Sequence, residues 1–175
     1  MRGRLILGLF VLGLATVGVA AAGLNGNWSN HATGTQEVPP RDTQGQGQAI
    51  FHLSKDGASI DYKLIASNIE NVFMAHIHRN VPGQNGPIVV WLYPSTAAVP
   101  GPLGAGRTDG ALVEGTITAG NIAASAPAGY TFSQLVSDMR DGNAYVNFHT
   151  NDGVGATNTG PGDFPGGEIR ADLSE

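Results

Sequence analysis

The 175-residue sequence contains no cysteine. This absence excludes disulfide bonds, a cysteine nucleophile and lipid attachment through a cysteine, so the folded chain depends on its core alone. Basic residues are also scarce, with nine lysines and arginines against fourteen acidic residues. A surface with net negative charge repels nucleic acid and anionic lipid, so we expect neither as a partner.

Motifs of hydrolases and nucleotide-dependent enzymes are missing as well. Serine and histidine both occur, but no nucleophile elbow accompanies them. No glycine-rich phosphate loop stands between a strand and a helix. These absences favour a non-catalytic protein without excluding every enzyme class.

Residues 1–22 have the pattern of a secretory signal peptide. Two arginines precede the apolar segment 5–19, and small residues occupy positions 20–22. Cleavage after position 22 would leave roughly 150 residues, the size of one domain, in a secreted or periplasmic location and without membrane contact. The alternative is an uncleaved anchor, because the apolar stretch approaches the length of about 20 residues that spans a bilayer.

Short apolar stretches separated by glycine, proline, asparagine and aspartate dominate the rest of the chain, whereas helix-forming runs are few. This pattern predicts an all-β fold, an antiparallel β-sandwich of immunoglobulin-like or superoxide-dismutase-like Greek-key type with one short helix. Residues 23–32 are expected to be a tether, or to include a first irregular strand. Residues 33–175 are expected to form one domain.

The clearest hairpin signal lies at residues 73–78 and 88–93, which flank a turn-rich segment. Because strand side chains alternate between the two faces, Ile77 is predicted to be buried while His76 and His78 project from the opposite face. Further strands are expected at 35–38, 46–53, 59–66, 111–118, 143–150 and 166–173. The predicted core consists of Phe51, Leu53, Tyr62, Leu64, Phe73, Ile77, Val90, Val146, Phe148 and Ile169.

One helix is predicted from Phe132 to Arg140, lying across an edge or end of the sheets. Thr131 and Gln134 fit a capping box at its start, and Gly142 can end it. Long loops are expected at 94–110 and 151–165, which are rich in glycine and proline.

Four blocks of sequence carry a resemblance to a known family. They are TQEVPP, AHIH followed by PGQNGPIV, YVNFHT and GGEIRADL. In this order and spacing they resemble the chordin domain (CHRD), over about residues 33–173. That family occurs as repeats in chordin, an extracellular antagonist of growth factors, and as secreted single-domain bacterial proteins. The resemblance implies an extracytoplasmic module that binds an extracellular protein or glycan through the hairpin and the long loops.

A metal site is the alternative hypothesis. Residues on alternate strand positions stand about 6 to 7 Å apart, and neutral histidine is a suitable ligand for zinc or copper. His149 is predicted to share a face with the two hairpin histidines, and a copper-loaded site would be open to redox activity. The full set of candidate binding residues is His76, His78, His149, Tyr145, Asn147, Glu168 and Arg170.

A purely structural arrangement of the same histidines is also open. They could bond to Glu168, to the backbone or to each other and brace a polar layer between sheet and loops. If a metal binds, its release is expected below about pH 6, where imidazoles protonate. His31 and His52 are predicted to lie on the surface, away from this site.

Overall fold

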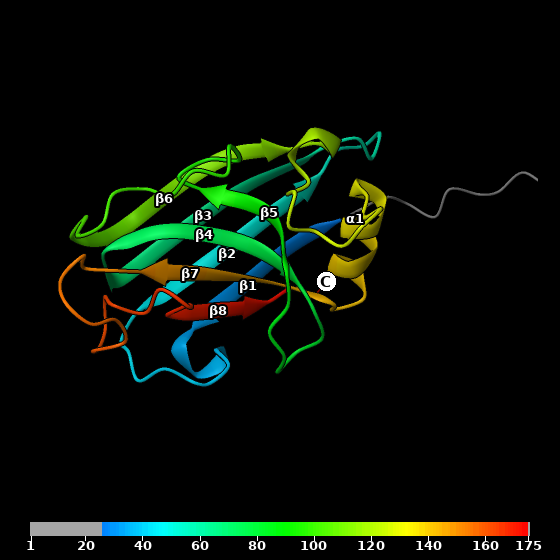
Figure 1. The fold of residues 1–175 in the computed structure, drawn as a ribbon. Coiled ribbons are helices and arrows are strands. Elements are labelled where there is room, and N and C mark those ends of the chain that lie inside the picture. Colours follow the sequence, from blue (N-terminus) through cyan, green and yellow to red (C-terminus); the bar gives the residue numbers. More distant parts are fainter. Residues whose placement is uncertain (1–25, 175) are drawn as a thin grey trace, which may run out of the picture.

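The computed structural model describes residues 26–174, and the expected signal peptide lies outside them. Within this range the chain forms eight strands, two short 3₁₀ turns and one α-helix (Figure 1). No helix in residues 26–174 is long and apolar enough to cross a membrane. The elements are β1 (Asn27–Thr33), η1 (Gly34–Gln36), β2 (Gln46–Leu53), β3 (Ile60–Glu70), β4 (Val72–Arg79), β5 (Ile88–Tyr93), β6 (Arg107–Ile117), η2 (Ala119–Asn121), α1 (Phe132–Arg140), β7 (Ala144–Thr150) and β8 (Ile169–Asp172).

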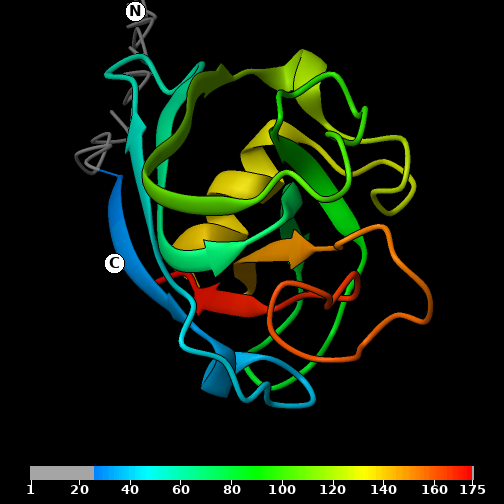
Figure 2. The same cartoon turned by 90° about the vertical axis from the view of Figure 1, so that its left-hand side faces the viewer.

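The strands form one antiparallel sheet in the order β5-β4-β7-β8-β1-β2-β3-β6. The sheet curls on itself into a barrel-like shape that Figure 2 shows from one end. A single bridge between Val90 and Ile122 ties β5 to the segment that follows β6. The predicted all-β antiparallel class is therefore confirmed, but the two packed sheets of a sandwich are replaced by one continuous curled sheet.

Twist and bulges explain this difference. β3 and β6 pair over eleven residues each and contain register shifts at Leu64/Ile65 and Ala66/Ile69. Bulges increase the local twist and bend a sheet toward closure. Alternation of buried and exposed positions is the same in a sandwich and in a barrel, so the sequence pattern does not separate them.

The apolar core fills the inside of the curled sheet. Eight of the ten residues predicted for the core belong to its main cluster: Phe51, Tyr62, Leu64, Ile77, Val90, Val146, Phe148 and Ile169. Leu53 is only partly buried and packs against this cluster, while Phe73 is buried without joining it. The alternation along the strands thus identified the inward face.

Helix α1 lies at one end of the sheet, as Figure 1 shows. Its bounds match the prediction, and Thr131 and Gln134 form the predicted capping box. Leu135 and Met139 are fully buried. The Trp28 indole Nε1 donates a hydrogen bond of 3.1 Å to the Met139 carbonyl, which ties the helix to β1.

Several expected boundaries differ from the structure. β3 continues to Glu70, beyond the expected 59–66, and β8 covers only Ile169–Asp172 of the expected 166–173. Three further differences change the type of element. The strand expected at 35–38 is wrong: η1 stands there, closed by a hydrogen bond of 3.2 Å from the Glu37 amide to the Gly34 carbonyl. Residues 107–110, expected in a loop, begin β6 because Arg107 pairs with Glu70. Residues 27–32, within the expected tether, form most of β1.

Candidate metal site

The outer face of β4, β7 and β8 carries a layer of polar side chains. Ala75, Ile77 and Phe148 point into the core, so their strand neighbours must point outward. The three histidines on this face are nevertheless buried, because loops 80–87 and 158–167 bond to His78 and His149. The segment 34–41 bonds in turn to both loops. His76, His78 and His149 are 0%, 8% and 6% exposed.

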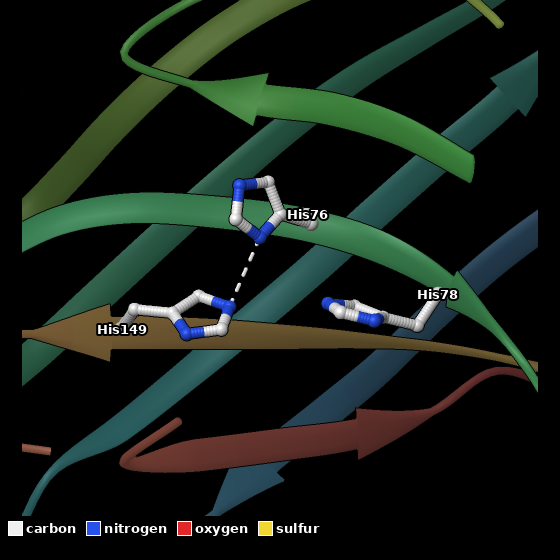
Figure 3. Close-up of side chains that lie close together, drawn as sticks. All are labelled: His76, His78 and His149. Carbon is white, nitrogen blue, oxygen red and sulfur yellow. Dashed lines mark hydrogen bonds between the residues drawn. The ribbon is translucent and has the colours of Figure 1, made fainter. Parts of the chain in front are cut away.

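The three histidines form one compact cluster, shown in Figure 3. His76 and His78 come from β4 and His149 from the neighbouring β7, whose Asn147 lies opposite His76. One nitrogen from each ring lies within 4.8 Å of the corresponding nitrogens of the other two. His76 Nδ1 and His149 Nε2 are 3.0 Å apart. The predicted convergence of these residues is therefore confirmed.

Backbone carbonyls fix the proton positions on two of the rings. His78 Nδ1 lies 2.9 Å from the Gly86 carbonyl, and His149 Nδ1 lies 2.9 Å from the Pro165 carbonyl. A carbonyl oxygen only accepts, so both Nδ1 atoms carry the proton in the neutral rings and both Nε2 atoms keep a lone pair. His149 Nε2 accepts in turn from His76 Nδ1.

This assignment leaves two lone pairs without donors. The Nε2 atoms of His76 and His78 are buried and have no hydrogen-bond partner among residues 26–174. Unpaired buried acceptors are uncommon in folded proteins and indicate strain, a missing water or a missing ion. His78 and His149 both hold their proton on a backbone carbonyl and present Nε2, an arrangement that is usual for metal-binding histidines.

Burial keeps the three imidazoles neutral. It lowers the pKa of His76 to about 2, helped by the neighbouring His149 and His78. Burial and His78 lower the pKa of His149 to about 4, and burial also lowers the pKa of His78. Neutral rings are the form in which histidine binds a metal.

The dimensions of the cluster fit a small transition-metal ion. Ligand nitrogens about 2.0 to 2.1 Å from a tetrahedral zinc ion stand about 3.3 to 3.4 Å apart. The His76–His149 distance of 3.0 Å is already close to this value. The widest separation allowed by the 4.8 Å limit then needs to close by no more than about 1.5 Å. His76 would bind through Nδ1, with its proton moved to Nε2.

Aromatic rings pack around the cluster. Trp91 from β5 meets His76 edge-on with ring centroids 4.2 Å apart. Tyr145 stacks on His78 at 4.9 Å, and the Arg170 guanidinium lies 3.5 Å from the centre of the Tyr145 ring. The predicted residues Tyr145 and Arg170 thus hold the His78 ring in place by stacking, and neither belongs to the histidine cluster itself. Trp91 was not predicted, because the uniformly apolar run of β5 hides its alternation.

Asn147 and Glu37 continue the polar layer from His78 toward the segment before Pro39. Both side chains are 3% exposed, and Asn147 interacts with His78 on one side and Glu37 on the other. Burial raises the pKa of Glu37 to about 7, against the opposing effects of Arg170 and Arg41. The sequence located Glu37 only through its place before Pro39 and Pro40, and it was not among the predicted binding residues.

Glu168 does not join the histidines. Its carboxylate accepts hydrogen bonds from the Thr43 hydroxyl at 2.5 Å, the Thr150 hydroxyl at 2.6 Å and the Gly162 amide at 2.8 Å. Of the bonds considered for the histidines, the one to Glu168 is therefore wrong, whereas bonds to the backbone and between two of the histidines are present. Residue 168 precedes β8, where the chain turns toward loop 158–167, and its carboxylate anchors that loop instead.

The remaining basic residues have partners elsewhere. Arg170 contacts Asp172 at 2.7 Å and donates to the Gln84 carbonyl at 3.0 Å. Arg79 pairs with Asp138 at 2.8 Å. His31 and His52 are exposed, as predicted. His31 and His52 therefore take no part in the cluster formed by His76, His78 and His149.

Comparison with known proteins gives one match. The family model of the CHRD domain matches residues 28–173. This range contains β2 to β8, all of β1 except its first residue, and every residue of the histidine cluster. No curated protein and no solved structure matches the sequence.

Proposed function

The chain belongs to the CHRD domain family, and from this premise we propose that it is an extracytoplasmic metal-binding protein that holds one zinc or copper ion on His76, His78 and His149. The observation that carries the proposal is the cluster itself. Three buried neutral imidazoles present ligand nitrogens within 4.8 Å of one another. Two of them are oriented by backbone carbonyls.

The buried nitrogen atoms without hydrogen-bond partners also support a metal site. A buried acceptor without a donor costs about 1 to 3 kcal/mol relative to the same group in water. His76 and His78 each bury such an atom among the described residues 26–174. A bound cation would use the unpaired lone pair of His78 Nε2, whereas His76 would bind through Nδ1 and carry its proton on Nε2, so that neither ring keeps a bare acceptor. A cluster that only braced the loops would gain nothing from this arrangement.

Metal loading tests the proposal. The protein is treated with EDTA, dialysed against equimolar Zn²⁺ or Cu²⁺ and analysed for bound metal. We expect one ion per chain in the wild type and none in His78→Gln/His149→Gln. The matched control is His31→Ala/His52→Ala, which removes two exposed histidines and should keep its ion.

Folding must be separated from binding in this test. Circular dichroism and thermal unfolding of each metal-free variant show whether the sheet remains intact. Glutamine keeps hydrogen-bonding capacity at both positions, so the double variant is expected to fold. Failure of the wild type to retain any metal, or equal retention by the double histidine variant, would contradict the proposal.

A second candidate function rests on the two long loops. Loop 94–106 and loop 151–165 meet through a hydrogen bond of 2.9 Å from the Gly104 amide to the Asn151 carbonyl. Leu103 and Val154 are 52% and 74% exposed. Loops held on a rigid scaffold carry binding residues more often than other segments do. We propose that these loops bind an extracellular protein or glycan.

Defined probes test this second function. A glycan array and a panel of purified extracellular proteins would be screened with the wild type and with Leu103→Ser/Val154→Ser. A partner that binds the wild type but does not bind the double variant would support these loops as the binding surface. Binding that is equal for both proteins would place the surface elsewhere.

A further inference from the structure

Asn147 occupies the centre of the polar layer. In the register of the sheet it lies between His76 on β4 and Arg170 on β8. Tyr145 and His149 flank it two residues away on the same face of β7. Its side chain is 3% exposed. Asn147 is therefore surrounded by the same elements that bring the histidines together.

Glu37 decides which end of the Asn147 amide faces the histidines. The Glu37 Oε1 and Asn147 Nδ2 atoms both lie against Gly167, where a Cβ would come within 2.6 and 2.7 Å of them. Nδ2 is thus the end of the Asn147 amide that faces Glu37, although Glu37 Oε1 itself is buried without a hydrogen-bond partner among residues 26–174. The interaction between these two side chains lowers the proton affinity of Glu37, as expected for an N–H donor. The amide oxygen is then left for the other side.

On that other side, two acceptors lack a donor. His78 donates its only ring proton to the Gly86 carbonyl, so its Nε2 atom is a bare acceptor. Asn147 Oδ1 is also an acceptor, and its side chain interacts with His78. Both atoms are buried and have no hydrogen-bond partner in the described part of the chain. Two adjacent buried acceptors need a species between them that accepts electron pairs or donates protons.

We propose that Asn147 Oδ1 is the fourth ligand of the metal held by the three histidines, and that Glu37 is the positioning residue that turns this oxygen toward the ion. The inference rests on the proposed function and deepens it. Three nitrogens and one protein oxygen complete a tetrahedral set without a coordinated water, which is the arrangement of a structural site. One oxygen and no sulfur ligand favour Zn²⁺ or Cu²⁺ over Cu⁺.

Substitutions at Asn147 test the ligand. Zn²⁺ affinity is measured by competition with a chelator for the wild type, Asn147→Leu and Asn147→Asp. We expect a loss of at least about tenfold in Asn147→Leu, because one ligand is removed. Asn147→Asp keeps an oxygen ligand but loses the NH₂ group that faces Glu37, so its affinity should lie between those of the wild type and Asn147→Leu. His52→Ala, at an exposed position of β2, should leave the affinity unchanged.

An open coordination position gives an independent readout that does not depend on how Asn147→Leu folds. Azide is titrated into the Co²⁺-loaded wild type and the absorption bands of cobalt are followed. If Asn147 fills the fourth position, azide leaves the wild-type spectrum unchanged and shifts the spectrum of Asn147→Leu. Azide that shifts the wild-type spectrum would overturn the inference, because it would reveal a water in place of Asn147.

Two substitutions test the positioning role of Glu37, because one keeps an acceptor oxygen in the side chain and the other keeps only a similar side-chain volume. Glu37→Gln keeps an acceptor for the Asn147 amide and should retain most of the affinity, whereas Glu37→Leu should weaken it. Equal affinity in Asn147→Leu and wild type, with metal still lost in the histidine double variant, would overturn the fourth ligand and leave the proposed function standing. A wild type that binds neither Zn²⁺ nor Co²⁺ would contradict the proposed function itself.

Discussion

Glu37 and Asn147 lie against the same glycine: a Cβ at Gly167 would be 2.6 Å from Glu37 Oε1 and 2.7 Å from Asn147 Nδ2. Real Cβ atoms do not approach other heavy atoms so closely, and Gly167 also has a φ of +121°. The two side chains therefore meet only because residue 167 has no side chain. This contact joins the segment before Pro39 to β7.

Replacing this glycine should destabilise the protein through both effects. We expect Gly167→Ala to lower the free energy of unfolding by about 1 to 3 kcal/mol from backbone strain, with a further loss from the clash. Gly110→Ala is the matched control, because φ is +128° there and no atom lies within 4 Å of the added Cβ. Urea denaturation of both variants measures the difference. Equal losses would mean that the Glu37–Asn147 contact tolerates a methyl group.

A core substitution tests the orientation of β4. Ile77 is fully buried inside the sheet, and Ile77→Ala should cost about 2 to 5 kcal/mol through lost burial and a cavity. Val154→Ala, at a position that is 74% exposed, should change stability by less than about 0.5 kcal/mol. A loss below that value for Ile77→Ala would place the histidines, and not Ile77, on the inner face.

Burial of Glu37 should leave a signature in the pH dependence of stability. Its pKa is raised from 4.5 to about 7, so between these values the folded chain keeps a proton that the unfolded chain has lost. The Glu37 contribution to the free energy of unfolding therefore falls as pH rises through this window.

Glu37→Gln removes this effect and leaves the other titrating groups in place. Relative to the wild type, the variant should gain up to about 3 kcal/mol between pH 5 and pH 8 in the metal-free protein. Denaturation at several pH values measures this difference. A difference that does not change with pH would show that the Glu37 carboxyl is ionised throughout, or hydrated.

Thr150 should be important for the loop that Glu168 anchors. The fully buried Thr150 hydroxyl donates to Glu168 at 2.6 Å and accepts from the Phe164 amide at 2.9 Å. Thr150→Val breaks both bonds and should cost about 1 to 3 kcal/mol. Thr116→Val, which breaks an exposed bond of 2.7 Å to Asp61, should cost much less. Similar losses in the two variants would contradict this role.

The sequence predicted the side-chain faces better than the shape of the sheet. Strict alternation in β2, β4 and β7 placed Phe51, Ile77 and Val146 inside, and so placed the histidines on the other face. Closure of the sheet depends on bulges and on the pairing of strands distant in sequence, such as β1 with β8. Neither follows from alternation.

Two parts of the site depend on contacts that local patterns do not encode. Glu168 shares the sequence block GGEIRADL with Arg170, yet it bonds to Thr43 and Thr150 and not to a histidine. Burial of the histidines requires the loops 80–87 and 158–167 to fold back over the sheet. The face of the sheet that carries the histidines was predictable from the sequence, whereas the loops that bury them were not.

Burial of the histidines under these loops lowers the pH at which we expect the metal to be released. Release near pH 6 is the expectation for accessible imidazoles, but burial lowers the pKa of His149 to about 4 and that of His76 to about 2. Protons therefore compete for the ligand nitrogens only at lower pH. Zinc should remain bound at pH 5, as measured by equilibrium dialysis, while a hexahistidine peptide releases it. Release from both near pH 6 would show that the cluster is open to solvent.

Anomalous X-ray scattering at the zinc edge, from crystals grown with Zn²⁺, shows directly whether the three histidines hold a metal ion. We expect one strong peak bounded by His76 Nδ1, His78 Nε2 and His149 Nε2, with Asn147 Oδ1 at bonding distance. A map with no peak there, or with peaks only beside the exposed His31 and His52, would contradict it.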